Sequence, residues 1–128
     1  MSEIKEAQRH LWEWQNRELP LKVNGLTQDE VDALPEQVRR ELFESRLIRG
    51  ATEEIGELCH ASLKQAQGIR YLPEVAEEMK KDAVADIVIY LLNLCSLLDI
   101  DFEDVLLTVI KKVTARRWAT KPMDAADE

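Results

Sequence analysis

The sequence predicts an all-α protein, a bundle of four to five helices. Of its 128 residues, 45% are hydrophobic but only 5% are aromatic, and Gly and Pro number four each. This balance favours helices over sheets. A chain of this length can bury one hydrophobic core but not two, so we expect one domain over residues 1–120 and a polar, disordered tail over residues 121–128.

The first two elements are marked by capping residues. Ser2 can cap a first helix, which should end near Leu19. Its apolar residues recur at helical spacing opposite a polar side, and they are Ile4, Ala7, Leu11 and Trp14. Asn24-Gly25 is a turn signal, and Thr27 and Glu30 have the spacing of a capping box. We therefore expect a loop followed by one short helix.

A long helix should follow this short one. Pro35 can occupy its first turn, where the missing N–H costs nothing, and apolar residues continue the helical pattern to about Gln67. Gly68 is placed to stop the helix. Gly50 lies inside it, and we expect this glycine to bend or break the helix.

Two more helices are expected, at about residues 74–98 and 101–118. The longest apolar run, residues 83–98, is shorter than the roughly 20 residues needed to span a bilayer, and it contains Asp86 and Asn93. A buried helix of a bundle explains this run better than a membrane span, so no membrane partner is expected.

The charge of the chain limits its partners. The formal net charge is -8, whereas binding to DNA or RNA depends on cations that neutralise phosphates. We therefore expect no nucleic-acid polymer as partner. A small phosphorylated ligand stays compatible with the charge, because a metal ion can lie between acidic side chains and an anionic substrate. The N-terminus is polar and lacks the apolar core of a signal peptide, which predicts a soluble cytoplasmic protein.

Three glutamates form the first candidate site. Glu54 precedes Glu57 by three residues and Glu53 precedes it by four, so their carboxylates project from one helical surface. An acidic face exposed to solvent is the more common explanation of such a motif in isolation.

Asp86 on the next long helix favours a functional explanation. Its sequence neighbours are mostly apolar, and an ionised carboxylate buried without a partner costs at least several kcal/mol. A cation, a hydrogen-bond network or a metal ion would remove this cost. Asp82 and Glu78 each lie one turn earlier and extend an acidic stripe along the helix.

Two helices that each offer carboxylates can surround a hard cation with oxygen ligands. Mg2+, or Mn2+ as the alternative, fits such a ligand set better than Zn2+, which prefers Cys or His. A rival metal site is a di-iron centre, because Glu57 and His60 form a Glu-x-x-His motif. Such a centre needs a second motif of this kind, and the only other histidine, His10, does not supply one. We therefore expect a packing or supporting role for His60.

The chain resembles a known family, the all-α nucleoside triphosphate pyrophosphohydrolases, or MazG-like proteins, over roughly residues 4–118. The family carries an ExxE motif on one helix and an ExxD motif on the next, followed by an apolar segment. The corresponding segments here are Glu54-Ile55-Gly56-Glu57 and Asp86-Ile87-Val88-Ile89-Tyr90-Leu91. The glutamate of ExxD falls on Ala83. Asp82 can take its place, but from a rotated position, which changes the metal geometry or the number of ions bound.

The resemblance implies hydrolysis of a nucleoside triphosphate, in particular a deoxynucleoside triphosphate, between the α and β phosphates. Mg2+ ions would be held by Glu54, Glu57 and Asp86, with Asp82 as a further candidate ligand. Glu53 is the candidate for orienting or deprotonating the attacking water, because it flanks the ligands on the same surface. Its alternative is an exposed glutamate without a catalytic role.

Substrate contacts need cations for the phosphates and a surface for the base. Each candidate cation could instead be an ordinary surface residue. Each candidate for contact with the base could instead pack in the core, and Trp12 is an alternative to Trp14 as the stacking residue. The predicted substrate-binding residues are Trp14, Lys64, Arg70, Tyr90, Asn93, Lys111 and Arg117.

Four helices leave the apolar helix at residues 74–98 hard to cover within one small chain. We therefore expect a homodimer or a dimer of dimers, with sites near the subunit interfaces, as the resemblance also implies. Two other classes of function stay open. One is an inactive nucleotide- or metal-binding regulator, which Ala83 keeps in consideration. The other is a structural helical adaptor, which would have to pair Asp86 with a Lys or Arg side chain.

Overall fold

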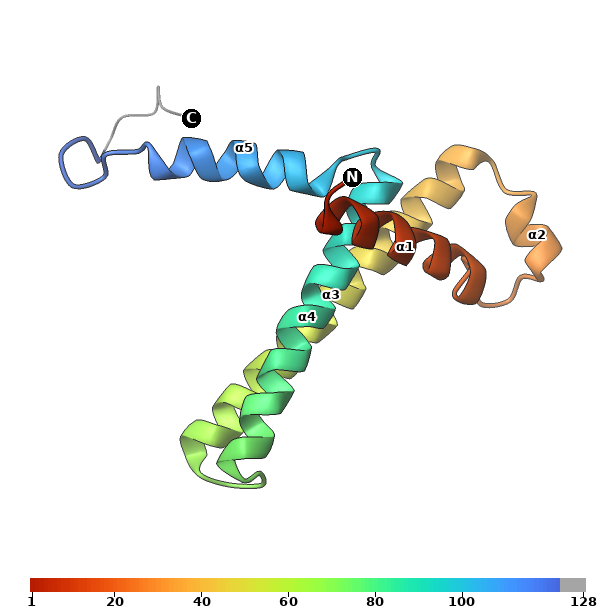
Figure 1. The fold of residues 1–128 in the computed structure, drawn as a ribbon. Coiled ribbons are helices and arrows are strands. Elements are labelled where there is room, and N and C mark those ends of the chain that lie inside the picture. The colour runs from red at the N-terminus through yellow and green to blue at the C-terminus, as the bar shows by residue number, and fades with distance from the viewer. Residues whose placement is uncertain (123–128) are drawn as a thin grey trace.

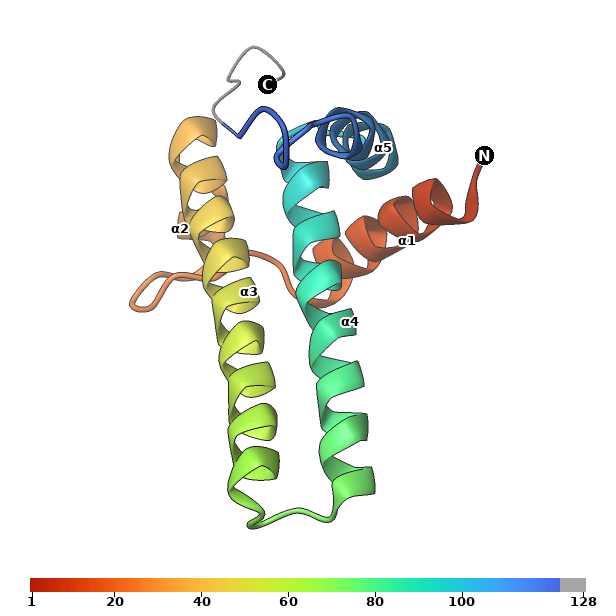
Figure 2. The same ribbon diagram turned by 90° about the vertical axis from the view of Figure 1, so that its left-hand side faces the viewer.

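The computed structural model describes residues 1–122, and this part of the chain contains five helices and no strand. The last residues of the expected disordered tail, 123–128, lie outside the described part. The helices α3 and α4 run side by side as a long antiparallel hairpin, α1 crosses α4 near one end of this hairpin, and α5 extends away from it (Figures 1 and 2). The helix bounds are α1 Glu3–Glu18, α2 Gln28–Asp32, α3 Glu36–Gln67, α4 Pro73–Leu97 and α5 Phe102–Thr114.

Most helix ends lie where the sequence predicts them. The side chains of Ser2 and Asp101 cap α1 and α5, and Thr27 and Glu30 form the predicted capping box of α2. Gly68 ends α3 in the left-handed conformation, with φ of 69°. Pro35 is the N-cap of α3 rather than a residue of its first turn.

The helix α5 ends at Thr114, earlier than the expected Trp118. No residue of α5 is buried, so no tertiary packing supports a further turn. The Ala115 N–H donates to the carbonyl of Lys112, and this tighter hydrogen bond marks the end of the helix.

Small side chains lie between α3 and α4. Ala61 and Ala76 are completely buried, and Ala51 and Ala83 are nearly so. Side chains of this size allow the two helix backbones to approach closely. The hairpin therefore has a thin core, and its outer surfaces keep many apolar residues in contact with solvent.

Gly50 has a different role from the one expected. The helix α3 continues through it, so the expected break at Gly50 is absent. A Cβ atom added at this position would overlap the ring of Tyr90 on α4. Glycine is therefore used here because it lets an aromatic ring lie directly against the α3 backbone.

Buried glutamine side chains connect α1 to the other helices. Gln8 Nε2 donates to the carbonyl of Ile100 at 2.8 Å, and Gln8 Oε1 accepts from the N–H of Phe102 at 3.0 Å. This amide thus joins α1 to the corner between α4 and α5. At the exposed edge of the same corner, Lys5 pairs with Asp101 at 2.7 Å and with Asp104 at 2.9 Å. Both contacts hold the first turn of α5 against α1.

Large apolar side chains remain exposed on α4 and α5. Val84, Val88 and Leu91 of α4 are 37–51% exposed, so the apolar run of this helix is only partly covered within one chain. In α5, the exposed apolar residues include Leu107 and Ile110. No single helix in residues 1–122 is long and apolar enough to cross a membrane; α4 and α5 together meet these criteria but are bent by 107° relative to each other.

Candidate metal and nucleotide site

Three carboxylates cluster on the middle of α3. One oxygen atom from each of Glu53, Glu54 and Glu57 lies within 4.8 Å of the others. Their spacing along a continuous helix produces this cluster, as the sequence predicts. Glu53 and Glu57 are exposed, whereas Glu54 is half-buried because its side chain turns toward α4.

Glu54 is the member of the cluster whose negative charge is disfavoured by its surroundings. Its Oε2 atom is buried and has no hydrogen-bond partner in residues 1–122. Burial, and then the negative charges of Glu57, Asp86 and Glu53, raises the pKa of this carboxyl group. A bound cation would satisfy the unpaired oxygen and offset the repulsion, so the donor set fits a hard divalent ion.

Asp86 approaches this cluster from α4, and it lines the same cavity as Glu54. It is half-buried, as Glu54 is, and its sequence neighbours Val84 and Val88 are exposed. The buried carboxylate oxygen without a hydrogen-bond partner, which we expected at Asp86, belongs to Glu54 in the described residues. The predicted meeting of acidic side chains from two helices is present.

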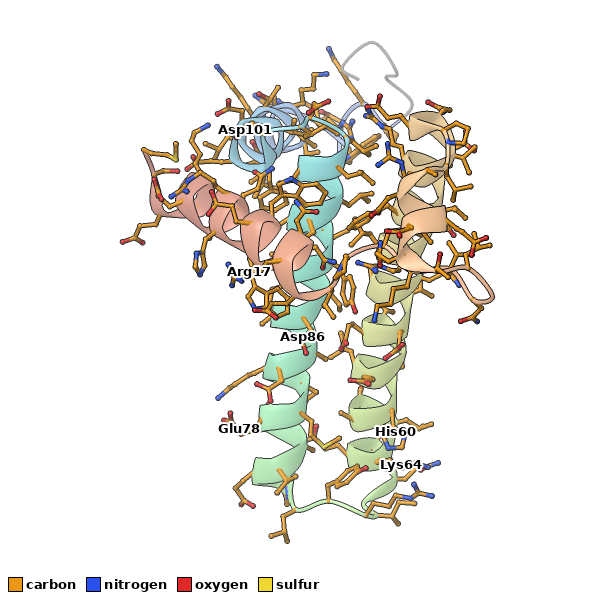
Figure 3. All side chains as sticks on the ribbon, turned by 90° about the vertical axis from the view of Figure 1, so that its right-hand side faces the viewer. Arg17, His60, Lys64, Glu78, Asp86 and Asp101 are labelled. Atoms are coloured by element: carbon orange, nitrogen blue, oxygen red, sulfur yellow. The ribbon has the colours of Figure 1, made fainter. Side chains whose placement is uncertain are left out.

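Asp82 lies outside both the cluster and the cavity. It is exposed, while the neighbouring Ala83 is 3% exposed and packs between the helices. Figure 3 shows Asp86 next to the region covered by α1, whereas Glu78 lies farther down the hairpin, where α1 does not reach. The acidic stripe of α4 thus enters the candidate site only at Asp86.

A cavity of about 440 Å³ lies beside the two carboxylates, between α1, α3 and α4. It brings together three of the predicted substrate-binding residues, Trp14, Tyr90 and Asn93. The residues that sequence reasoning missed come mostly from α1 and the turn after it. They are His10, Leu11, Gln15, Leu19 and Ile89, of which only Leu11 was noted in the apolar pattern.

The α1 residues of the cavity were not predicted because this helix is oriented differently from what its apolar pattern suggested. The apolar pattern suggested that Ile4, Ala7, Leu11 and Trp14 face the core, but Ile4 and Ala7 are exposed. The buried residues of α1 are instead Gln8 and Gln15. These two glutamines are seven residues apart, which places them on one helical face, and this spacing was the available signal.

The predicted cations do not reach the carboxylates in one chain. Lys64 donates to Gln67 at 3.1 Å, and Arg70 lies in the turn of the hairpin with φ of 72°. Figure 3 shows Lys64 and His60 near the hairpin end that is remote from α1. Lys111 is on α5 and Arg117 follows it, and α5 extends away from the hairpin (Figure 1).

His60 interacts with a tyrosine rather than with the acidic cluster. Its Nε2 atom lies 3.1 Å from the hydroxyl of Tyr71, and the two rings pack edge to face. The one group of side chains in residues 1–122 whose geometry could hold a metal ion contains glutamates only. This arrangement agrees with a packing role for His60.

Comparison with known proteins adds one finding. The family model described as the MazG nucleotide pyrophosphohydrolase domain matches residues 43–119, more than half of the chain. The match includes α4, α5 and most of α3, and therefore every carboxylate of the candidate site. No curated protein and no solved structure matches the chain.

Proposed function

Because the chain belongs to the MazG nucleotide pyrophosphohydrolase family, we propose that it hydrolyses a nucleoside triphosphate, in particular a deoxynucleoside triphosphate, in a Mg2+-dependent reaction. Water adds to the α phosphorus, and the bond from this phosphorus to the oxygen bridging to the β phosphate breaks. The products are the monophosphate and pyrophosphate. The observation that carries the proposal is the buried, unpaired Oε2 of Glu54 beside Glu57 and Asp86.

We assign the metal ligands to Glu54, Glu57 and Asp86, with Asp82 as a further ligand if its side chain turns toward them. All of these donors are carboxylate oxygens, which suit Mg2+, with Mn2+ as the alternative. A Mg2+ ion held by these residues would neutralise phosphate charge and lower the pKa of a coordinated water. Repulsion among the three glutamates, which raises the pKa of Glu54, would be relieved at the same time.

Glu53 is our candidate for the general base. It is exposed and lies in the same cluster as the proposed ligands, so its carboxylate can contact a water held between the protein and the α phosphate. In this role Glu53 accepts the proton that the attacking water loses. Cationic side chains, together with a metal ion held by the carboxylates, would stabilise the negative charge of the leaving pyrophosphate.

The nucleoside would occupy the cavity beside the carboxylates, where Trp14 offers an aromatic face and Tyr90 and Asn93 line the wall. Lys64 and Arg70 stay candidates for phosphate contacts through movement of their long side chains. Lys111 and Arg117 lie on a segment that extends away from this cavity (Figure 1), so they would contact the phosphates bound by a second copy of the chain.

We propose a homodimer or a dimer of dimers. The exposed apolar side chains of α4 and α5, including Val88 and Leu107, need covering, and a second copy presents matching surfaces. Light scattering at micromolar concentration should give at least twice the chain mass of 14.8 kDa, and a monomer would contradict the proposal. We place the reaction in the cytoplasm, where nucleoside triphosphates are abundant, with no membrane or nucleic-acid polymer as partner.

The activity is tested by incubating the chain with Mg2+ and a set of triphosphates and assaying pyrophosphate and monophosphate. The variant Glu54→Gln should lose at least about a hundredfold in kcat/KM, since it removes a ligand charge. Glu41→Gln, the same change at an exposed position of α3, should retain the wild-type value. Release of diphosphate and orthophosphate instead would contradict the assignment.

A second candidate function is a nucleotide-binding regulator without turnover. Ala83 favours it, because a methyl group packed between the helices replaces a carboxylate of the family motif. In that case Mg2+-dependent binding of a triphosphate would be retained while no pyrophosphate appears.

A further inference from the structure

A chain of hydrogen bonds connects three helices behind the cavity. Arg46 of α3 donates from Nη2 to the carbonyl of Leu19 at 2.6 Å, and Gln15 of α1 donates from Nε2 to the same carbonyl at 2.9 Å. Asn93 of α4 then donates from Nδ2 to Gln15 Oε1 at 3.5 Å. Gln15 and Asn93 are 3% and 1% exposed, so the hydrogen bond between them is shielded from water, whereas the bond from Arg46 to Leu19 is exposed.

The direction of this chain determines which atom of Asn93 is free. A backbone carbonyl only accepts hydrogen bonds, so the group of Gln15 that faces Leu19 must be the amide nitrogen. Gln15 therefore presents its oxygen to Asn93, and Asn93 must donate to this oxygen from its amide nitrogen. The remaining atom, Asn93 Oδ1, is an acceptor that is buried and has no hydrogen-bond partner among the described residues.

An unpaired buried acceptor normally has a ligand or an ordered water as its partner. Asn93 lines the cavity that also contains Trp14 and the carboxylates Glu54 and Asp86. A nucleotide whose phosphates lie at these carboxylates would place its base in the same cavity. We propose that Asn93 Oδ1 accepts a hydrogen bond from the exocyclic amino group of the base, so that the site prefers cytosine and adenine over uracil and hypoxanthine. This inference rests on the proposed nucleotide site.

The preference follows from the polarity of the two groups. The 4-amino group of cytosine and the 6-amino group of adenine are donors, and they would satisfy Asn93 Oδ1. Uracil and hypoxanthine carry a carbonyl oxygen at the same ring positions, which would place two acceptors against each other and leave both unpaired. Gln15 keeps the Asn93 amide from rotating to offer its nitrogen instead. Gln15 is thus a positioning residue for base selection.

The test compares two matched substrate pairs that differ in this group, dCTP with dUTP and dATP with dITP. We expect kcat/KM to be about tenfold or more higher for the amino member of each pair. Asn93→Leu removes the acceptor, and Gln15→Leu frees the amide to rotate, so both variants should bring the ratios toward one. Asn16→Leu, a similar change at an exposed position of α1, should keep the wild-type ratios.

Calorimetric titration with dCMP and dUMP separates this inference from the proposed hydrolysis. If no triphosphate is hydrolysed but dCMP binds about tenfold more tightly than dUMP, the catalytic proposal fails and the base preference stands. If triphosphates are hydrolysed with a uracil preference, or with ratios that Asn93→Leu leaves unchanged, the base preference is wrong and the hydrolysis stands. Equal affinity for the two monophosphates would also overturn it, and circular dichroism spectra confirm that each variant is folded.

Discussion

Glu54→Gln should stabilise the metal-free protein, which is the opposite of the usual effect of changing a partly buried side chain. The carboxylates of Glu53 and Glu57 have oxygen atoms within 4.8 Å of one on Glu54. Two unit charges at this distance repel by about 1 kcal/mol in water-like surroundings. Removing both repulsions would contribute about 2 kcal/mol, which salt reduces to about 1 kcal/mol. For a chain of this size, Tm should rise by about 4 °C.

Mg2+ should reverse the order of the two proteins. A ligand at a hundredfold excess over its Kd stabilises the folded state by about 2.7 kcal/mol, or about 10 °C here. Wild-type protein should gain this increase when Mg2+ replaces EDTA in differential scanning calorimetry, whereas Glu54→Gln should gain little. Glu41→Gln serves as the control and should behave as wild type in both buffers. A Tm of Glu54→Gln below that of wild type in EDTA, or an undiminished response of this variant to Mg2+, would contradict the prediction.

Three further predictions concern the same helices. Because the pKa of Glu54 is raised in the folded state, the contribution of Glu54 to metal-free stability should be most favourable below about pH 4, the ordinary pKa of glutamate, and should fall as the pH rises through the raised pKa. The Tm advantage of Glu54→Gln over wild type should therefore increase from pH 4 to pH 7. Gly50→Ala should lower the free energy of unfolding in urea by about 1–3 kcal/mol and reduce kcat/KM, because the added methyl group must displace the Tyr90 ring from beside Glu54. Unchanged values would show that the ring has room to move. Gln8→Leu should lower the free energy of unfolding in urea by about 2 kcal/mol or more, because the carbonyl of Ile100 and the N–H of Phe102 lose their partner. A smaller loss would mean that water replaces the amide.

Local patterns were sufficient to predict the helices and much of the site. Capping residues such as Thr27 and Asp101, and the stop at Gly68, act within one turn of the chain, so their effect is visible in the sequence. The spacing of Glu53, Glu54 and Glu57 likewise determines their grouping once the segment is helical. The family match agrees with the family resemblance seen in the sequence.

Other features depend on how the helices pack. The rotation of α1 places Gln8 and Gln15 inside and leaves Ile4 exposed, and no local rule distinguishes the two faces of this helix. Glycine is needed at position 50 because the ring of Tyr90, 40 positions later in the chain, lies against it from another helix. The direction of α5, which separates Lys111 from the carboxylates, is set at its first turn by contacts with α1.

The carboxylates of α3 and α4 include both a feature that the sequence predicts and a feature that depends on packing. Helical periodicity in the sequence predicted which side of its own helix carries Glu54 and which carries Asp86, because it fixes the side chains that share one side of a helix. Which carboxylate oxygen is desolvated depends on the neighbouring helices, so the sequence could not predict it. In the described residues the buried oxygen without a partner belongs to Glu54, and Val84 and Val88, which flank Asp86 in the sequence, are exposed.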